Sequence, residues 1–171
     1  SQIVINLNWD RVRQPIDLDL CVLLEMKDGS TDCLEAIRGN FGNLDSYPFV
    51  LHSGDDLTGD FAEGEYLYVS LEHLKQIKRM CVFAYIYRGA KSWKNAKGVI
   101  WVDVPGHPLL EVPMGEQTSP APLCAICMIE VDGDQIHLER LVSFHGSMRH
   151  PAWHGSWQND LDAQYSWNMN W

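Results

Sequence analysis

The chain has 171 residues, 46% of them hydrophobic, and a formal net charge of −10 at pH 7. This negative charge disfavours nonspecific binding to nucleic acid or to a membrane surface. Apolar runs such as MCVFAYIY are far shorter than the roughly 20 residues that span a bilayer. The amino terminus also lacks the basic and then apolar pattern of a signal peptide. We therefore expect a soluble protein without a membrane span.

The length is typical of one domain, because a chain of this size buries roughly two-thirds of the surface that its unfolded form exposes. We expect a single domain over residues 1–171. The sequence starts at Ser1 and not at Met, and it stops at Trp171 within a patterned segment. We therefore also expect it to be part of a longer chain.

The five cysteines form an odd set that is scattered through apolar segments. This distribution argues against a secreted disulfide framework and predicts a reducing, cytoplasmic environment. Cys124 and Cys127 have the C-x-x-C spacing of zinc and redox sites, but PLCAICMIEV reads as a strand. Residues three apart in a strand point to opposite faces. We therefore expect these thiols to serve as small apolar side chains.

Most segments alternate between apolar and polar residues, which is typical of half-buried strands. The first such segment is IVINLNW, in which Ile3, Ile5, Leu7 and Trp9 share one face. Further strands are predicted, in chain order, in IDLDLCVLLEM, YPFVLHS, EYLYVSL, KRMCVFAYIYR, GVIWVDV, LLEVPM, LCAICMIEV, IHLERLVSFH and YSWNMNW. Turn residues separate them, including the Asp-Gly of VDGDQ, which favours a tight hairpin.

One segment, SLEHLKQIKRM, has helical spacing, with Leu71, Leu74 and Ile77 on one side and Ser70 as a suitable N-cap. Many evenly spaced strands with one helical turn predict an all-β protein. We expect an antiparallel β-sandwich of about ten strands with one short helical turn. A barrel is the alternative, and we favour the sandwich because so many strands carry one polar face.

Carboxylates gather in two places. In IDLDL, Asp17 and Asp19 are two apart in a predicted strand and project from one face, while the apolar residues around them form the other. The second place is the glycine-rich loop HSGDDLTGDFAEGEY, which contains no Lys or Arg. Its acids are Asp55, Asp56, Asp60, Glu63 and Glu65. If the strand after Asp19 and the strand before His52 share a sheet end, the two groups converge.

Such convergence predicts a bound cation. Two unit charges about 4 Å apart interact by roughly 4 kcal/mol in a partly screened environment, whereas a whole domain is stable by about 5–15 kcal/mol. Oxygen ligands in an irregular loop favour Ca²⁺, and the absence of Cys and of any His besides His52 disfavours zinc and copper. The spacing is not that of an EF-hand. The alternative is a solvated acidic loop that binds no ion.

The acidic motifs resemble those of the tellurite-resistance TerD family. DLDL at 17–20 and HSGDDLTGD at 52–60 are similar to the D-x-D-L strand and the G-D-[DN]-x-T-G loop of its members. YVSLEHLKQIKRMCVFAYIY resembles the strand, short turn and strand that follow this loop, and AIRGNFGNLDS resembles another family segment. The closing DAQYSWNMNW is similar to the TerA-like branch. The resemblance covers nearly the whole chain.

This resemblance implies a non-catalytic, calcium-binding β-sandwich found in bacterial proteins of tellurite resistance and stress responses. The metal ligands that it implies are Asp17, Asp19, Asp55, Asp56, the carbonyl of Gly59, and Asp60. After Gly59 the sequence reads DFAEGEY and departs from the family pattern. Glu63 and Glu65 are therefore candidates whose roles stay open, as does the choice between one ion and two. The implied partners are calcium ions and other stress-response proteins.

Two other functions stay open. The same carboxylates could hold the metal of a hydrolase, although the G-x-S-x-G, phosphate-loop and H-E-x-x-H motifs are absent. In the stretch 85–97, Tyr85, Tyr87 and Trp93 alternate with basic residues, which could bind nucleic acid or an acidic partner. A basic hairpin loop is the simpler interpretation.

Three histidines, His145, His150 and His154, have a spacing close to that of metal ligands. No carboxylate in the neighbouring sequence would orient their rings, and Pro151 indicates an irregular connection. We therefore do not expect a soft-metal site there.

Overall fold

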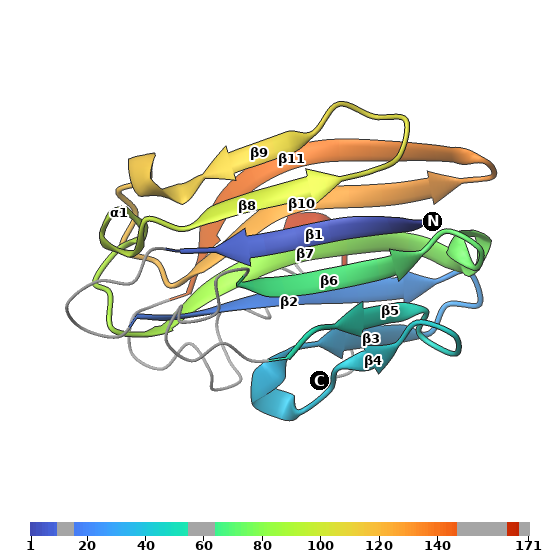
Figure 1. Cartoon of the computed structure of the whole chain (residues 1–171), viewed down its shortest axis with the longest axis horizontal. Helices are drawn as coiled ribbons and strands as arrows, with labels where there is room; N and C mark the ends of the chain where they lie inside the picture. The colour runs from blue at the N-terminus through green and yellow to red at the C-terminus, as the bar shows by residue number, and fades with distance from the viewer. Residues whose placement is uncertain (10–15, 55–63, 147–163, 168–171) are drawn as a thin grey trace.

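The computed structural model describes residues 1–9, 16–54, 64–146 and 164–167. In this part of the chain, eleven strands form two sheets that lie face to face (Figure 1). One sheet has the order β4 (Gly42–Asn43), β5 (Val50–His52), β6 (Glu65–Ser70), β1 (Gln2–Asn8), β8 (Val99–Asp103) and β9 (Leu110–Pro113). The other has the order β11 (Gln135–His145), β10 (Leu123–Asp132), β7 (Ile77–Arg88), β2 (Asp17–Met26) and β3 (Thr31–Leu34). All pairings between these strands are antiparallel, so the predicted sandwich is confirmed.

The space between the sheets is filled by the apolar positions that the alternation predicts. In β1, Ile3, Ile5 and Leu7 are fully buried, and the residues between them are partly exposed. They belong to the same apolar cluster as Leu18 and Leu20 of β2 in the facing sheet. Because complete burial of one such side chain is worth about 1.5–3 kcal/mol, this inner core is the main source of stability.

A second apolar cluster covers the outer face of the five-stranded sheet. It contains Cys21 and Leu23 of β2, Phe83 of β7, and Trp167 near the end of the described chain. β2, β7 and β10 are consequently buried on both faces, as their almost unbroken burial patterns show. The sequence alternation did not predict this second layer.

The helical segments are single turns. They are η1 (Ala36–Arg38), η2 (Leu74–Gln76), α1 (Trp93–Ala96) and η3 (Met114–Glu116). The helix predicted in SLEHLKQIKRM is only the 3₁₀ turn η2, because Ile77 already begins β7. The prediction of Ser70 as its N-cap is wrong, since Ser70 ends β6 and His73 occupies the cap position. α1 was not predicted.

Two strand predictions need correction. In YSWNMNW, Gln164 and Tyr165 are helical and Ser166 lies in a turn with φ of 51°, so the described part of this segment is not a strand. In β10, the register shifts between Ala125 and Cys127. This β-bulge places Cys124 and Cys127 in the same inner cluster, so the expectation that they face opposite ways is wrong.

The thiols nevertheless have the expected structural role. All five cysteines are free and buried. Burial raises the pKa of Cys81 and of Cys124 to about 12, with smaller contributions from nearby charged groups. The described residues contain no helix with the length and apolar character that crossing a membrane requires.

Candidate functional site

Asp17 and Asp19 lie at the start of β2, at the left-hand end of the molecule in Figure 1. Leu18 and Leu20 point into the inner core, so the two aspartates face the opposite side of the sheet, as predicted. Their exposed fractions are only 2% and 4%. Buried carboxylates are stabilised by hydrogen bonds or opposite charges, and Arg88 is one such partner of Asp17.

Among the strands that the structure describes, β3 covers only the later part of one edge of β2. β3 pairs with β2 only from Val22 to Glu25. At Leu20, two residues before Val22, two side chains from the other sheet bind the backbone of β2. The backbone N–H of Leu20 donates to Oε2 of Glu65 at 2.8 Å, and Nε2 of His52 lies 2.8 Å from the carbonyl oxygen of Leu20.

The second nitrogen of His52 identifies its tautomer. The backbone N–H of Gly54 donates to Nδ1 of His52 at 3.0 Å. Nδ1 is therefore an acceptor, and Nε2 carries the proton that is donated to Leu20. Both ring nitrogens are engaged, so His52 has no lone pair left for a metal ion.

These contacts attach both ends of the acid-rich loop to β2. His52 ends β5 and Glu65 begins β6, and Ser53 and Tyr66 continue the pairing of these strands through a backbone bond of 2.9 Å. Gly64 lies so close to β1 that a Cβ atom would be 2.1 Å from the carbonyl oxygen of Leu7. Its φ of 71° also favours glycine. The loop therefore leaves and re-enters the fold beside the start of β2.

The structure describes only one part of the predicted convergence of Asp17 and Asp19 with the acid-rich loop. The strands after Asp19 and before His52 do meet, although β2 and β5 belong to different sheets. Glu65 also lies beside β2. The other predicted loop ligands, Asp55, Asp56, Gly59, Asp60 and Glu63, lie outside the described residues. Their proximity to Asp17 and Asp19 stays a prediction.

In the described part of the chain, charged groups of both signs lie near the aspartates. Nε of Arg88, which is largely exposed, lies 3.6 Å from Oδ2 of Asp17. Burial, followed by the charges of Glu35 and Asp19, raises the pKa of Cys21 well above its usual value. Burial also raises the pKa of Glu35, against the opposing effect of its ion pair with Arg38.

The donor set fits a hard cation in part. Asp17 and Asp19 offer carboxylate oxygens, which Ca²⁺ prefers. Within the described ranges, no group of three or more His, Cys, Asp or Glu residues is arranged to hold a metal ion. A complete site would therefore need further ligands from outside these ranges, and the loop at 55–63 is the predicted source. Glu65 instead has a structural contact through Oε2, which the sequence did not reveal because its partner is a backbone group 45 residues away.

The aromatic and basic stretch 85–97 and the predicted histidine group contain buried side chains. Tyr85 and Trp93 are buried, so neither is available to stack on a nucleic-acid base. His145 is also buried, and its Nε2 lies 2.8 Å from Oγ of Ser143. His150 and His154 lie outside the described residues.

One curated protein is similar to this chain in sequence, and two solved structures are similar to it in fold. The chain is 31% identical over its whole length to "Tellurium resistance protein TerA" from Alcaligenes sp, and it spans 51% of that relative's length. A solved structure of a TerD homologue from Streptomyces coelicolor A3(2) superposes with a TM-score of 0.65 at 18% identity, covering 88% of this chain and 92% of the other. A structure of a protein of unknown function superposes with a TM-score of 0.60 at 15% identity, over 84% and 91% of the two chains. No protein-family profile matches the chain.

The fold is therefore that of the TerD-like β-sandwiches. Together with the similarity to the TerA protein over the whole of this chain, this fold supports a TerD-family tellurite-resistance domain. The chain spans about half the length of the curated relative that it matches.

Proposed function

We propose that this domain is a non-catalytic, calcium-binding module of the tellurium-resistance and stress-response type. The observation that carries the proposal is the burial of Asp17 and Asp19 side by side on one face of β2, next to the two anchored ends of an acid-rich loop. Ca²⁺ is bound by carboxylate and carbonyl oxygens, so two strand carboxylates beside an acid-rich loop are a suitable set of donors.

In this proposal Asp17 and Asp19 supply ligands from a rigid strand. The loop supplies the remaining ligands, which are drawn from Asp55, Asp56, the carbonyl of Gly59, Asp60 and Glu63. Bound Ca²⁺ would contribute positive charge that neutralises these oxygens. His52 and Glu65 position the loop ends and do not need to touch the ion.

The proposed role is recognition and not chemistry. A loop whose order depends on an ion offers a partner protein a surface that exists only when the ion is bound. The relative's name supports a role in tellurium resistance, and the partners would be other proteins of that response in the bacterial cytoplasm. Hydrolysis of a phosphoester that requires the same aspartates would contradict the non-catalytic role.

Thermal unfolding with calcium and with EDTA tests the proposal. A ligand that binds only the folded state stabilises it by about 2.7 kcal/mol at a free concentration 100 times its dissociation constant. We expect calcium to raise the Tm by several degrees in the wild type and to have no effect on Asp17→Asn combined with Asp19→Asn. Asp103→Asn is the matched control, because Asp103 is an exposed strand residue. Equal midpoints with calcium and with EDTA in the wild type would refute calcium binding.

A further inference from the structure

A pocket of about 570 Å³ lies beside the short helix α1. Its lining includes three lysines, Lys91, Lys94 and Lys97, and no carboxylate of a described residue. Ile16 and Ala90 supply an apolar part of the wall. The volume is within the roughly 300–1,000 Å³ of small-molecule sites.

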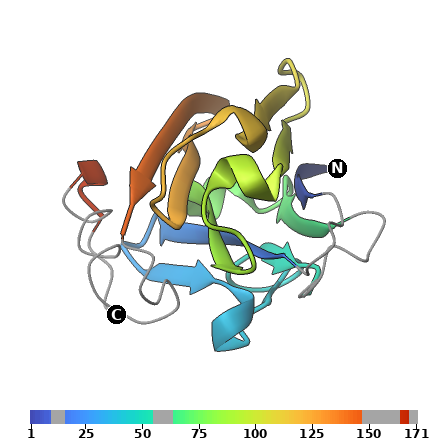
Figure 2. The same ribbon diagram turned by 90° about the vertical axis from the view of Figure 1, so that its left-hand side faces the viewer.

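The fold holds α1 firmly and presents the lysines outward. Trp93 and Ala96 are fully buried, and Nε1–H of Trp93 donates to the carbonyl oxygen of Ala121 at 3.0 Å. The lysines, at a spacing of three residues, are exposed. Figure 2 views the molecule from this end, with α1 toward the viewer. The positions of the lysines are therefore set by a rigid support.

The charges of these lysines are not balanced within the described part of the chain. Lys91, Lys94 and Lys97 form no ion pair with another described residue, whereas Lys75, Lys78, Arg79 and Arg88 each pair with a carboxylate. Like charges that share one pocket repel each other, and a bound anion would remove this repulsion.

The backbone of Lys97 is fixed at the end of α1, where its N–H donates to the carbonyl oxygen of Trp93 at 3.1 Å. Lys97 follows α1 in the left-handed conformation, with φ of 53°. Glycine is the usual residue at this position because it has no Cβ penalty.

We propose that this pocket binds the phosphate chain of a multiply phosphorylated small molecule. Three ammonium groups match several phosphate charges, and the apolar wall of Ile16 and Ala90 can receive an attached organic group. The pocket adjoins the aspartate site, because Ile16 precedes Asp17 and Arg88 pairs with Asp17. The binding itself does not require calcium.

The test is calorimetric titration with inorganic tripolyphosphate in the presence of EDTA, which removes metal-mediated binding. One variant replaces Lys91, Lys94 and Lys97 with Gln. The matched control replaces Lys75, Lys78 and Arg140 with Gln, which removes the same charge from exposed positions elsewhere. We expect the wild type and the control to bind alike and the pocket variant to bind at least about tenfold more weakly.

Titration with ATP distinguishes the source of the phosphate chain. Binding of ATP more tightly than tripolyphosphate assigns the apolar wall to a nucleotide, and the reverse order assigns the pocket to inorganic polyphosphate. The absence of saturable binding of both probes would overturn the proposal. Equal weakening in the pocket variant and the control would also overturn it, since that result means attraction to overall charge.

Discussion

The carboxylate of Glu65 accepts a hydrogen bond from the backbone N–H of Leu20 at 2.8 Å, and this contact joins the two sheets of the sandwich. Both partners are buried. His52 also bonds the carbonyl oxygen of Leu20. The two side chains thus bind the backbone of β2 at a place where the described part of β3 does not pair with it. The same two side chains hold the ends of the acid-rich loop.

Removal of the Glu65 carboxylate should destabilise the fold. Glu65→Ala leaves the buried N–H of Leu20 without its acceptor, which costs about 1–3 kcal/mol. Glu65→Gln keeps an acceptor oxygen and should cost less. Urea denaturation measures the difference, with Glu111→Ala on the exposed side of β9 as control. Equal stability of Glu65→Ala and Glu111→Ala would show that the contact contributes nothing.

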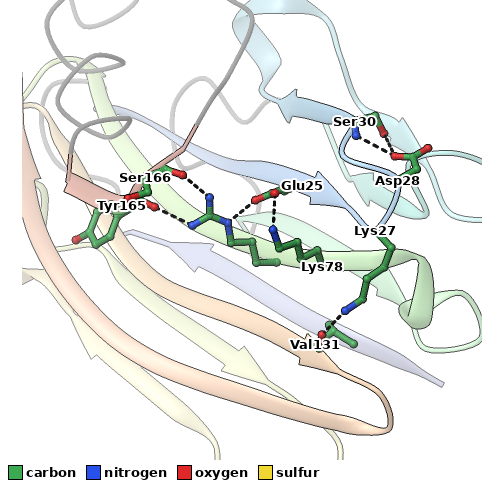
Figure 3. Close-up of polar contacts among 9 residues, drawn as sticks. Glu25, Lys27, Asp28, Ser30, Lys78, Val131, Tyr165 and Ser166 are labelled. Atoms are coloured by element: carbon green, nitrogen blue, oxygen red, sulfur yellow. Dashed lines mark hydrogen bonds and ion pairs between the residues drawn. The ribbon is translucent and has the colours of Figure 1, made fainter.

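Acid should weaken the fold through Glu25. Partial burial opposes the shift, but hydrogen bonds from Lys78 and Arg79 hold the pKa of Glu25 below its ordinary value of 4.5 (Figure 3). A lowered folded-state pKa means that this stabilisation is present above the unfolded value and is lost as the pH falls through the folded value. Glu25→Gln should therefore flatten the loss of stability between about pH 5 and pH 3. An unchanged acid limb in chemical denaturation would argue against this role.

Arg79 should hold the end of the described chain against the outer face of the sheet. Its guanidinium donates to the carbonyl oxygens of Tyr165 and Ser166, both at 2.7 Å (Figure 3). It also stacks 4.0 Å from the centre of the Trp167 ring. Arg79→Gln should speed hydrogen exchange in peptides that contain residues 164–167. Arg140→Gln on β11 is the control, and equal exchange in the two variants would contradict the prediction.

The cysteines should be unreactive in the folded protein. Burial raises the pKa of Cys81 and of Cys124 to about 12, so the reactive thiolate is scarce at neutral pH. We expect slow alkylation of all five thiols in buffer and complete alkylation in denaturant. Rapid alkylation of any of them at about pH 8 would show that its burial is incomplete.

The sequence predicts local features of this fold well. The alternation in β1 identifies Ile3, Ile5 and Leu7 as core residues, and the D-x-D spacing places Asp17 and Asp19 on one face. Such features depend only on the two-residue period of a strand.

Features that depend on distant segments were not predicted. The second apolar layer requires Trp167 to pack against β2 and β7, and the bulge in β10 changes the faces of Cys124 and Cys127. The contacts of His52 and Glu65 with Leu20 involve a backbone group, which carries no sequence signal. Alternation alone gives no information about such long-range contacts.

We propose that the buried Asp17 and Asp19 bind a calcium ion. A crystal structure of the protein grown with calcium tests it most directly. We expect an ion within about 2.3–2.6 Å of carboxylate oxygens of Asp17 or Asp19. Oxygens from residues 55–63 should complete its coordination. A structure grown under these conditions in which both aspartates bind only protein groups, with the loop carboxylates in solvent, would contradict it.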